Sequence, residues 1–241
     1  MRSSILDLVN CPACNGRLNV DVAEASGLEI LSGQLVCNDC GQHYPIEQRM
    51  PLLYVNDSRW SSKAREAQGW VAYHKNLGIY HQPEDAVDLK IPYYSEEPWI
   101  SVARHFDIAM DLMKLTGSEV ILDLGAGRGW AAKQFALKGC RVVAIDVVAD
   151  EQVGLGRAWA LMENAGTWFE AVIGDSENLP FFSETFDIVF CAAVLHHTSD
   201  LPGLLKSVCE VLKPGGVLIA VNEPCISIYA DQEAILRRDA A

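Results

Sequence analysis

The second half of the chain alternates short apolar runs with stretches of helical periodicity. Apolar residues dominate 120–124, 141–146, the stretch before Gly174, 186–190 and the stretch that ends at Val221. Each run has the length of one buried strand. Residues 130–137 form a helical stretch after the first run, and apolar side chains between Ile100 and Leu115 recur at helical spacing. The pattern predicts an α/β core.

The first 56 residues have a different pattern, with short alternating segments between two Cys-x-x-Cys pairs. Residues 17–20 and 34–36 alternate as short strands do, and the pairs are Cys11 with Cys14 and Cys37 with Cys40. Each pair turns the backbone so that two thiolates face one point, and two such turns form the tetrahedral sulfur site that zinc prefers. We expect a zinc ribbon over residues 1–56 in which the metal is structural, because protein ligands fill all four positions.

Between these parts, residues 57–116 are rich in aromatic side chains and contain Pro83, Pro92 and Pro98. The prolines predict short helices and loops. We expect this segment to cover the binding site as a lid or substrate cap, although the same aromatic residues can instead join the ribbon to the core.

Length, composition and charge narrow the classes of function. The 241 residues suffice for one α/β domain and a small appendage. A formal net charge of −13 repels phosphate backbones, so a small-molecule acceptor is favoured over nucleic acid. No apolar run reaches the roughly 18 residues of a membrane span, and no signal peptide is evident. We therefore expect a cytoplasmic protein, in which the later cysteines, at 140, 191, 209 and 225, are small buried hydrophobic residues.

Candidate cofactor-binding residues follow the predicted strands. The first strand runs into the glycine-rich turn Gly125-Ala126-Gly127-Arg128-Gly129, and the second ends at Asp146, whose carboxylate can accept from ribose hydroxyls. Both features occur in dinucleotide-binding domains as well, so they leave the cofactor open. Asp175, after the third strand, can accept from an adenine amino group.

The ordered set of motifs across 118–222 resembles class I S-adenosylmethionine-dependent methyltransferases, especially the branch that includes ubiquinone and menaquinone biosynthesis methyltransferases. The resemblance implies a Rossmann-like sheet and assigns the cofactor by residue. The methionine end falls to Asp123, Gly125, Ala126, Gly127 and Gly129, the ribose to Asp146, and the adenine edge to Asp175 and Ser176. Residues 8–56 are similar to the small zinc-ribbon activator subunits that pair with tRNA and protein methyltransferases.

His196 and His197 follow the fourth predicted strand, at the edge where α/β proteins bind ligands. Either imidazole can take a proton from an acceptor atom, since histidine titrates near neutral pH. Methyl transfer from a sulfonium depends mainly on alignment, however, so a catalytic base is optional. The histidine pair is therefore a candidate base, and a feature of the fold is the favoured alternative.

The catalytic domain is expected to cover 117–241, which leaves only 222–241 after the fifth strand. The C-terminal hairpin of the resembled fold does not fit in this length. Either the chain is a fragment, or the sheet stops at an apolar edge strand, which favours association with a partner or a second copy. The leading hypothesis is methyl transfer to an O, N or C atom of a small-molecule, lipid-precursor or sugar-containing acceptor. RNA methylation with the ribbon as a docking element, a non-catalytic scaffold and, more distantly, a nicotinamide dehydrogenase are the alternatives.

Overall fold

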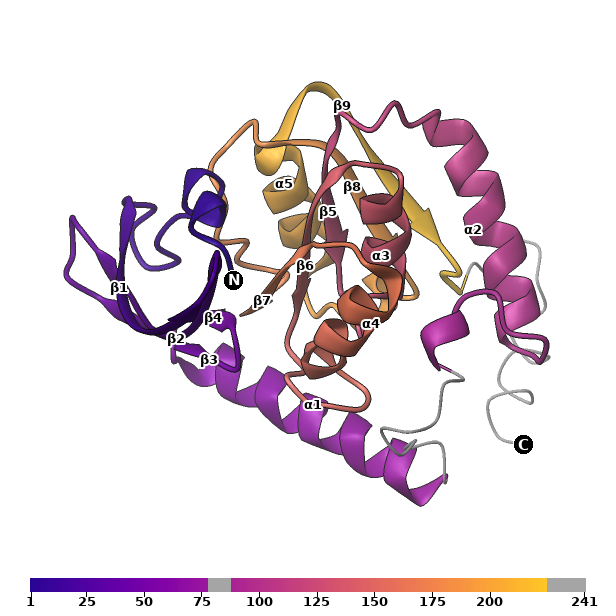
Figure 1. The fold of residues 1–241 in the computed structure, drawn as a ribbon, viewed down its shortest axis with the longest axis horizontal. Coiled ribbons are helices and arrows are strands. Elements are labelled where there is room, and N and C mark those ends of the chain that lie inside the picture. The colour runs from indigo at the N-terminus through magenta and orange to yellow at the C-terminus, as the bar shows by residue number, and fades with distance from the viewer. Residues whose placement is uncertain (78–87, 225–241) are drawn as a thin grey trace.

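The computed structural model describes residues 1–77 and 88–224, and the chain forms one mixed sheet in the order β1-β2-β3-β4-β7-β6-β5-β8-β9 (Figure 1). Its strands are β1 (Leu18–Ser26), β2 (Glu29–Cys37), β3 (His43–Glu47), β4 (Met50–Leu53), β5 (Val120–Leu124), β6 (Arg141–Asp146), β7 (Glu170–Gly174), β8 (Phe186–Ala192) and β9 (Leu212–Val221). Strands β4 to β9 pair in parallel, as the α/β prediction requires.

The N-terminal ribbon is continuous with this sheet. Strands β1, β2 and β3 pair antiparallel, and β3 continues through a tight turn into β4. Strand β4 then pairs in parallel with β7, placing Leu52 beside Ile173 and Leu53 beside Gly174. The sequence predicted a ribbon in front of the core but gave no sign of this shared sheet, because pairing partners are far apart in the chain. After Leu53 the chain leaves the sheet, three residues before the predicted boundary at 56.

A second seam joins the ribbon to the core. The backbone of Leu8 and Asn10 pairs with the segment after β7, where Phe182 N donates to Leu8 O and Asn10 N donates to Pro180 O. The Arg2 guanidinium lies 3.9 Å from the centre of the Trp168 ring, and the Arg2 amide donates to the buried Glu170 carboxylate. The ribbon is thus anchored at several points along the β7 edge.

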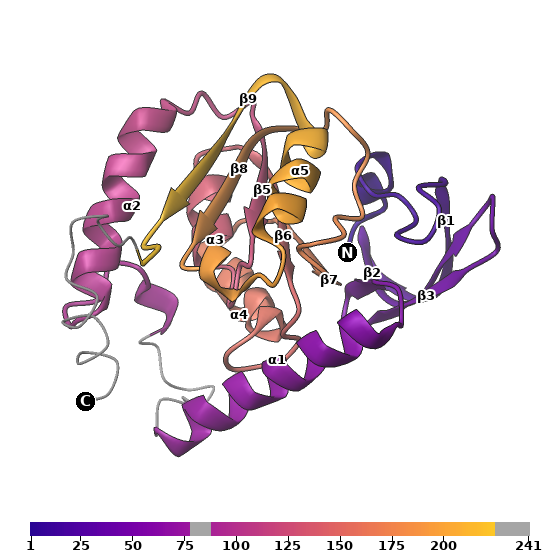
Figure 2. The ribbon, with the colours of Figure 1, turned by 180° about the vertical axis from the view of Figure 1, so that it is seen from behind.

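Helices cover both faces of the parallel part of the sheet (Figures 1 and 2). Helix α5 (Leu201–Val211) packs on one face, and α2 (Trp99–Met113), α3 (Trp130–Leu137) and α4 (Ala158–Ala165) pack on the other. Strand β6 shows how the sequence serves both layers, because Val143 and Ile145 join the α5 cluster while Val142 and Ala144 join the α3 cluster. Apolar residues on both faces are typical of buried parallel strands.

The aromatic segment differs from the prediction in its first half. Residues Ser58–Asn76 form one long helix, α1, which Asp57 caps by accepting from Trp60 N. The prolines do not interrupt it because all three lie beyond its end; Tyr80 and Pro83 fall outside the described residues. Short helices occur only later, with η2 at Asp88–Lys90. Helix α1 runs along the carboxyl ends of the core strands (Figure 2).

At the other end of the sheet, β9 is the edge strand of the part that the structure describes. The expected association through this edge therefore stays a prediction, and residues 225–241 lie outside the described part of the chain. Cys140 and Cys191 are buried as expected, whereas Cys209 is exposed on α5, which corrects that expectation; Cys225 is not among the described residues. Within 1–77 and 88–224, no helix has the length and apolar character that a membrane crossing requires.

Candidate active site

The glycine-rich turn lies between β5 and α3, and backbone geometry explains its composition. Gly125, Gly127 and Gly129 have φ values of +65°, +54° and +81°, a region that residues with a Cβ rarely adopt. A Cβ at Gly125 would lie 2.6 Å from the Val194 side chain, whereas a Cβ at Gly127 would point into open space. The turn is therefore tightly packed on one side and open at Gly127, where a ligand can approach the backbone.

Asp146, at the carboxyl end of β6, connects this turn to the next loop. Its Oδ2 accepts from Gly127 N at 2.8 Å and its Oδ1 accepts from Val148 N at 2.8 Å. Burial raises the pKa of the carboxyl group, partly offset by these amides. Each oxygen keeps a lone pair, so the carboxylate can hold both loops and still accept from a ribose.

Asp123 is buried at the end of β5 and points at the start of α3. Its Oδ2 accepts from Ala132 N at 2.9 Å, which satisfies one of the free amides of the helix start. Desolvation, with a smaller contribution from the nearby Asp146, raises the pKa of Asp123 to about 7, against the lowering effect of the Ala132 amide. The side chain thus has a structural role in the helix in addition to its predicted place near the methionine end.

We predict that Asp123→Asn changes the pH dependence of stability. In the folded chain Asp123 stays protonated up to a pKa of about 7, but in the unfolded chain it ionises near the ordinary aspartate pKa of 3.8. The folded state therefore binds more protons between these values, and its stability falls as the pH rises through this window, by up to about 4 kcal/mol. An asparagine keeps an acceptor for Ala132 N and has no charge to bury. Urea unfolding at pH 5 and pH 8 should show that the free energy of unfolding of the variant, relative to that of the wild type, is higher at pH 8 than at pH 5. An equal difference at both pH values contradicts the assignment.

Asp175 and Ser176 follow β7, where the adenine edge was predicted. The Asp175 carboxylate is buried and already engaged by α1: Oδ2 lies 3.1 Å from Arg59 Nε and Oδ1 lies 3.2 Å from Lys63 Nζ. Lys63 also contacts Glu177 Oε1 at 2.9 Å. Asp175 thus holds α1 on the core, and its contact with adenine stays a prediction.

A cavity of about 420 Å³ lies between α1 and the loop after β6. The loop side is formed by residues 147–150, directly after Asp146, and the helix side by residues of α1 between Ala64 and Lys75. Most of the lining is small or apolar, and Gln68, Lys75 and Asp150 are its polar members. Its position beside Asp146 and its mainly apolar lining suit a flat base.

The predicted histidines lie in a short turn after β8, η4 (Leu195–His197). His196 Nδ1 lies 2.9 Å from Glu223 Oε2, and His197 Nδ1 lies 3.4 Å from Glu66 Oε1 on α1. The His197 ring also meets Trp70 edge-on at 6.2 Å, so the aromatic side of α1 faces the histidine pair. Sequence reasoning did not identify Glu223, Lys63 or Arg59. Their partners are distant in the chain, and no local motif marks them.

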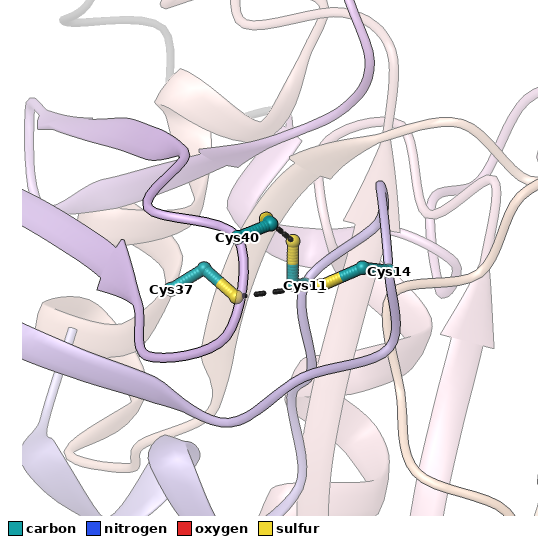
Figure 3. Close-up of side chains that lie close together, drawn as sticks. All are labelled: Cys11, Cys14, Cys37 and Cys40. Atoms are coloured by element: carbon teal, nitrogen blue, oxygen red, sulfur yellow. Dashed lines mark hydrogen bonds between the residues drawn. The ribbon is translucent and has the colours of Figure 1, made fainter.

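The four ribbon cysteines converge on one point (Figure 3). Their sulfur atoms all lie within 4.8 Å of one another, with Cys11 and Cys40 3.7 Å apart and Cys14 and Cys37 3.5 Å apart. Four ligands at about 2.3 Å from zinc, arranged tetrahedrally, have sulfurs roughly 3.8 Å apart. The Tyr44 hydroxyl lies 3.0 Å from the Cys11 sulfur and can orient it. The donor set and spacing fit a tetrahedral zinc site.

Comparison with known proteins follows the same division of the chain. Residues 122–220 match the family model described as a methyltransferase domain, and residues 2–48 match the one described as Trm112p-like protein. A sterol 24-C-methyltransferase of Eremothecium gossypii is 32% identical over 52% of this chain and 34% of its own length. The mitochondrial arginine-hydroxylase NDUFAF5 of Rattus norvegicus is 31% identical over 64% of this chain and 39% of its own.

The crystal structure of the PH0226 protein of Pyrococcus horikoshii OT3 superposes with a TM-score of 0.52 at 23% identity, covering 70% of each chain, which shows a shared fold. The chain spans well under two thirds of the length of the two curated relatives named above. The motifs after β5, β6 and β7, the parallel sheet and the matched domain agree with one another. The chain therefore carries a class I S-adenosylmethionine-dependent methyltransferase domain at residues 122–220 and a Trm112p-like region at residues 2–48.

Proposed function

We propose that the chain transfers a methyl group from S-adenosylmethionine to an O, N or C atom of a small-molecule acceptor, such as a lipid precursor or a sugar-containing metabolite. The observation that carries the proposal is Asp146, which connects the open glycine turn to the loop that lines the cavity. The Asp146 carboxylate is therefore next to the glycine turn, proposed to bind the methionine end of the cofactor, and next to the cavity, proposed to bind its base. S-adenosylmethionine supplies the methyl group and its thioether leaving group.

Different residues of this site bind different parts of the cofactor in this proposal. The amides and open space around Gly127 accept the methionine end, near Asp123. Asp146 accepts from the ribose hydroxyls, and the base enters the cavity under α1. Asp175 and Ser176 are expected at the adenine edge. A hydrogen bond to a charged oxygen, such as that of a carboxylate, is stronger than one to a neutral oxygen.

Alignment and exclusion of water account for most of the rate gain in this proposal. The glycine turn and the turn after β8 are packed against each other at Gly125 and Val194, so both are held in place before the cofactor binds. Helix α1 covers the cavity and is held on the core by the ion pairs of Lys63 and Arg59 with Asp175. Its aromatic side chains face the histidine pair, which makes α1 the expected place for acceptor selectivity.

The ribbon holds a structural zinc ion in this proposal, with Cys11, Cys14, Cys37 and Cys40 as ligands. All four positions of a tetrahedral ion are then filled by protein, which leaves none for substrate. The ribbon's contribution is to extend the sheet at β7 and to support the chain segment that enters α1.

The acceptor class rests on charge and on the relatives. The net charge of −13 disfavours phosphate-rich acceptors, although RNA docked on the ribbon remains the alternative. One relative is named as a sterol methyltransferase and another as an arginine hydroxylase, so the shared domain serves different reactions in different proteins. The acceptor must therefore be found by experiment.

The decisive experiment combines binding with label transfer. Calorimetry with S-adenosylhomocysteine should give saturable heat, and NAD should give none. Methyl-labelled S-adenosylmethionine should then label the small-molecule fraction of a cell extract. Label found only in RNA rejects the small-molecule acceptor, and binding without any transfer favours a non-catalytic scaffold. Absence of heat with either form of the cofactor removes the proposal as a whole.

A further inference from the structure

Glu223, two residues after the end of β9, is the centre of a hydrogen-bond network at the turn after β8. Its Oε1 accepts from Val194 N at 2.7 Å and from Leu195 N at 2.9 Å. Its Oε2 accepts from His196 Nδ1 at 2.9 Å and, more weakly, from His196 N at 3.3 Å. Burial alone raises the pKa of the Glu223 carboxyl group, but these donors outweigh burial and lower it. Glu223 is therefore an ionised carboxylate that orients one imidazole.

The two histidines differ in how firmly they are held. The Glu223 side chain is 13% exposed and its contact with His196 is short, whereas Glu66 is 59% exposed and lies 3.4 Å from His197. A proton on His196 Nδ1 that is donated to Glu223 leaves the lone pair on Nε2. Within the described residues, His196 Nε2 has no hydrogen-bond partner. The side chain is 36% exposed, so a small molecule can reach it.

This turn lies at the methyl-transfer site proposed above. The Val194 side chain fills the space against Gly125 in the glycine turn. At the other end of the turn, His197 lies close enough to Asp146 to act on its carboxyl group, whose pKa burial raises overall and a charge on His197 lowers. His196 thus lies between Val194, which contacts the glycine turn, and His197, which lies near Asp146.

We propose that His196 is the proton acceptor of the reaction, that Glu223 is its positioning residue, and that the methyl acceptor is a hydroxyl or N–H group. The inference rests on the proposed function and specifies its acceptor. The acceptor oxygen or nitrogen forms the bond to the methyl carbon, and the bond from sulfur to that carbon breaks with its electron pair remaining on sulfur. The proton of the acceptor group moves to His196 Nε2, and the Glu223 carboxylate stabilises the resulting imidazolium.

The charged and titratable neighbours of His196 define the expected pH dependence. Glu223 contacts its ring, the His197 ring lies tilted against it with the centroids 4.2 Å apart, and His105 on α2 contacts Asn222, the residue before Glu223. Turnover should fall as the pH drops through the range in which an imidazole takes up a proton. In Glu223→Gln this decline should move to lower pH, because a neutral amide does not stabilise the imidazolium.

The test compares variants of the full chain with labelled S-adenosylmethionine and the small-molecule fraction of a cell extract. His196→Asn should lower kcat at least 100-fold and leave the Kd for S-adenosylhomocysteine within about two-fold. Glu223→Gln should lower kcat about ten-fold with the shifted pH profile, and Glu223→Asp should recover part of the loss. His43→Asn, an exposed histidine of the ribbon that also contacts a side-chain oxygen, is the matched control and should behave as wild type.

A second measurement reads the dyad without turnover. Long-range proton–nitrogen NMR spectra of the full chain with S-adenosylhomocysteine should place the His196 proton on Nδ1, and Glu223→Gln should abolish this preference. Wild-type kcat in His196→Asn, or a proton on Nε2, overturns the dyad while the methyltransferase proposal stands. The same holds if His197→Asn alone removes turnover. A wild type that binds no cofactor and transfers no label instead overturns the proposed function itself.

Discussion

Replacing Cys37 with serine is expected to unfold the ribbon and to lower the stability of the whole chain. Metal binding to structural four-ligand sites contributes about 10–16 kcal/mol in isolated zinc peptides, which is as large as the total stability of a typical domain. A serine hydroxyl is a poor zinc ligand, so the variant should bind far less metal than the one ion per chain expected of the wild type.

The effect should extend beyond the ribbon because the two parts share a hydrophobic cluster. Leu35, Ile46 and Leu53 of the ribbon pack in the same cluster as Val143 and Val172 of the core. Loss of the ribbon uncovers these side chains and exposes the β7 edge, at a cost of about 25 cal/mol for each Å² of apolar surface. Hydrogen exchange should therefore accelerate in β1–β4 and also in β7.

Cys209→Ser is the matched control for this variant. Cys209 is an exposed free cysteine on α5 and is not one of the four clustered ribbon thiols. The Cys209→Ser protein should retain one zinc ion per chain and the wild-type melting temperature. A Cys37→Ser protein with full zinc content and the melting curve of Cys209→Ser contradicts both the metal site and its structural role.

The second large effect is expected for Asp146→Asn, which should weaken S-adenosylhomocysteine binding about 100-fold. An asparagine has a single acceptor oxygen, so its NH₂ group faces either Gly127 N or Val148 N, and one of these amides loses its partner. The ribose also loses a charged acceptor. Hydrogen bonds to charged groups contribute about 1.5–3 kcal/mol each, and 2.7 kcal/mol corresponds to roughly 100-fold in Kd.

Calorimetry checks this prediction, with Asp187→Asn as control. Asp187 is also a carboxylate on a core strand and accepts from Val120 N and Lys213 Nζ. It is the second residue of β8, however, whereas Asp146 is the last residue of β6, so the two lie at opposite ends of the parallel strands. Its replacement should cost stability without changing the Kd. Equal Kd values for the wild type and Asp146→Asn argue against the ribose site proposed here.

The sequence located most of the candidate site because that part depends on local chemistry. Each carboxylate follows an apolar run, and parallel strands bring their carboxyl ends to one edge of a sheet, so Asp123 and Asp146 were expected to be neighbours. The structure adds that each also binds a backbone amide. It also engages Asp175 with α1, which no strand pattern indicates.

Local information failed where the structure depends on distant pairs. The long helix α1 was expected as short pieces, because the density of prolines in the whole segment outweighed their absence from Ser58–Asn76. Glu223 looked like an ordinary residue after a strand, although it binds a turn almost 30 residues earlier. Neither a helix length nor a distant partner is encoded in the spacing of a few neighbouring residues.

The sequence by itself determined the strands, the glycine turn with its carboxylates and the four thiols, because each depends on residue type and spacing within a few positions. Only the tertiary structure decided that β4 extends the core sheet at β7, that α1 is latched over the cavity and that Glu223 orients His196. Such contacts depend on which surfaces meet when apolar faces are buried, and that is a property of the whole chain.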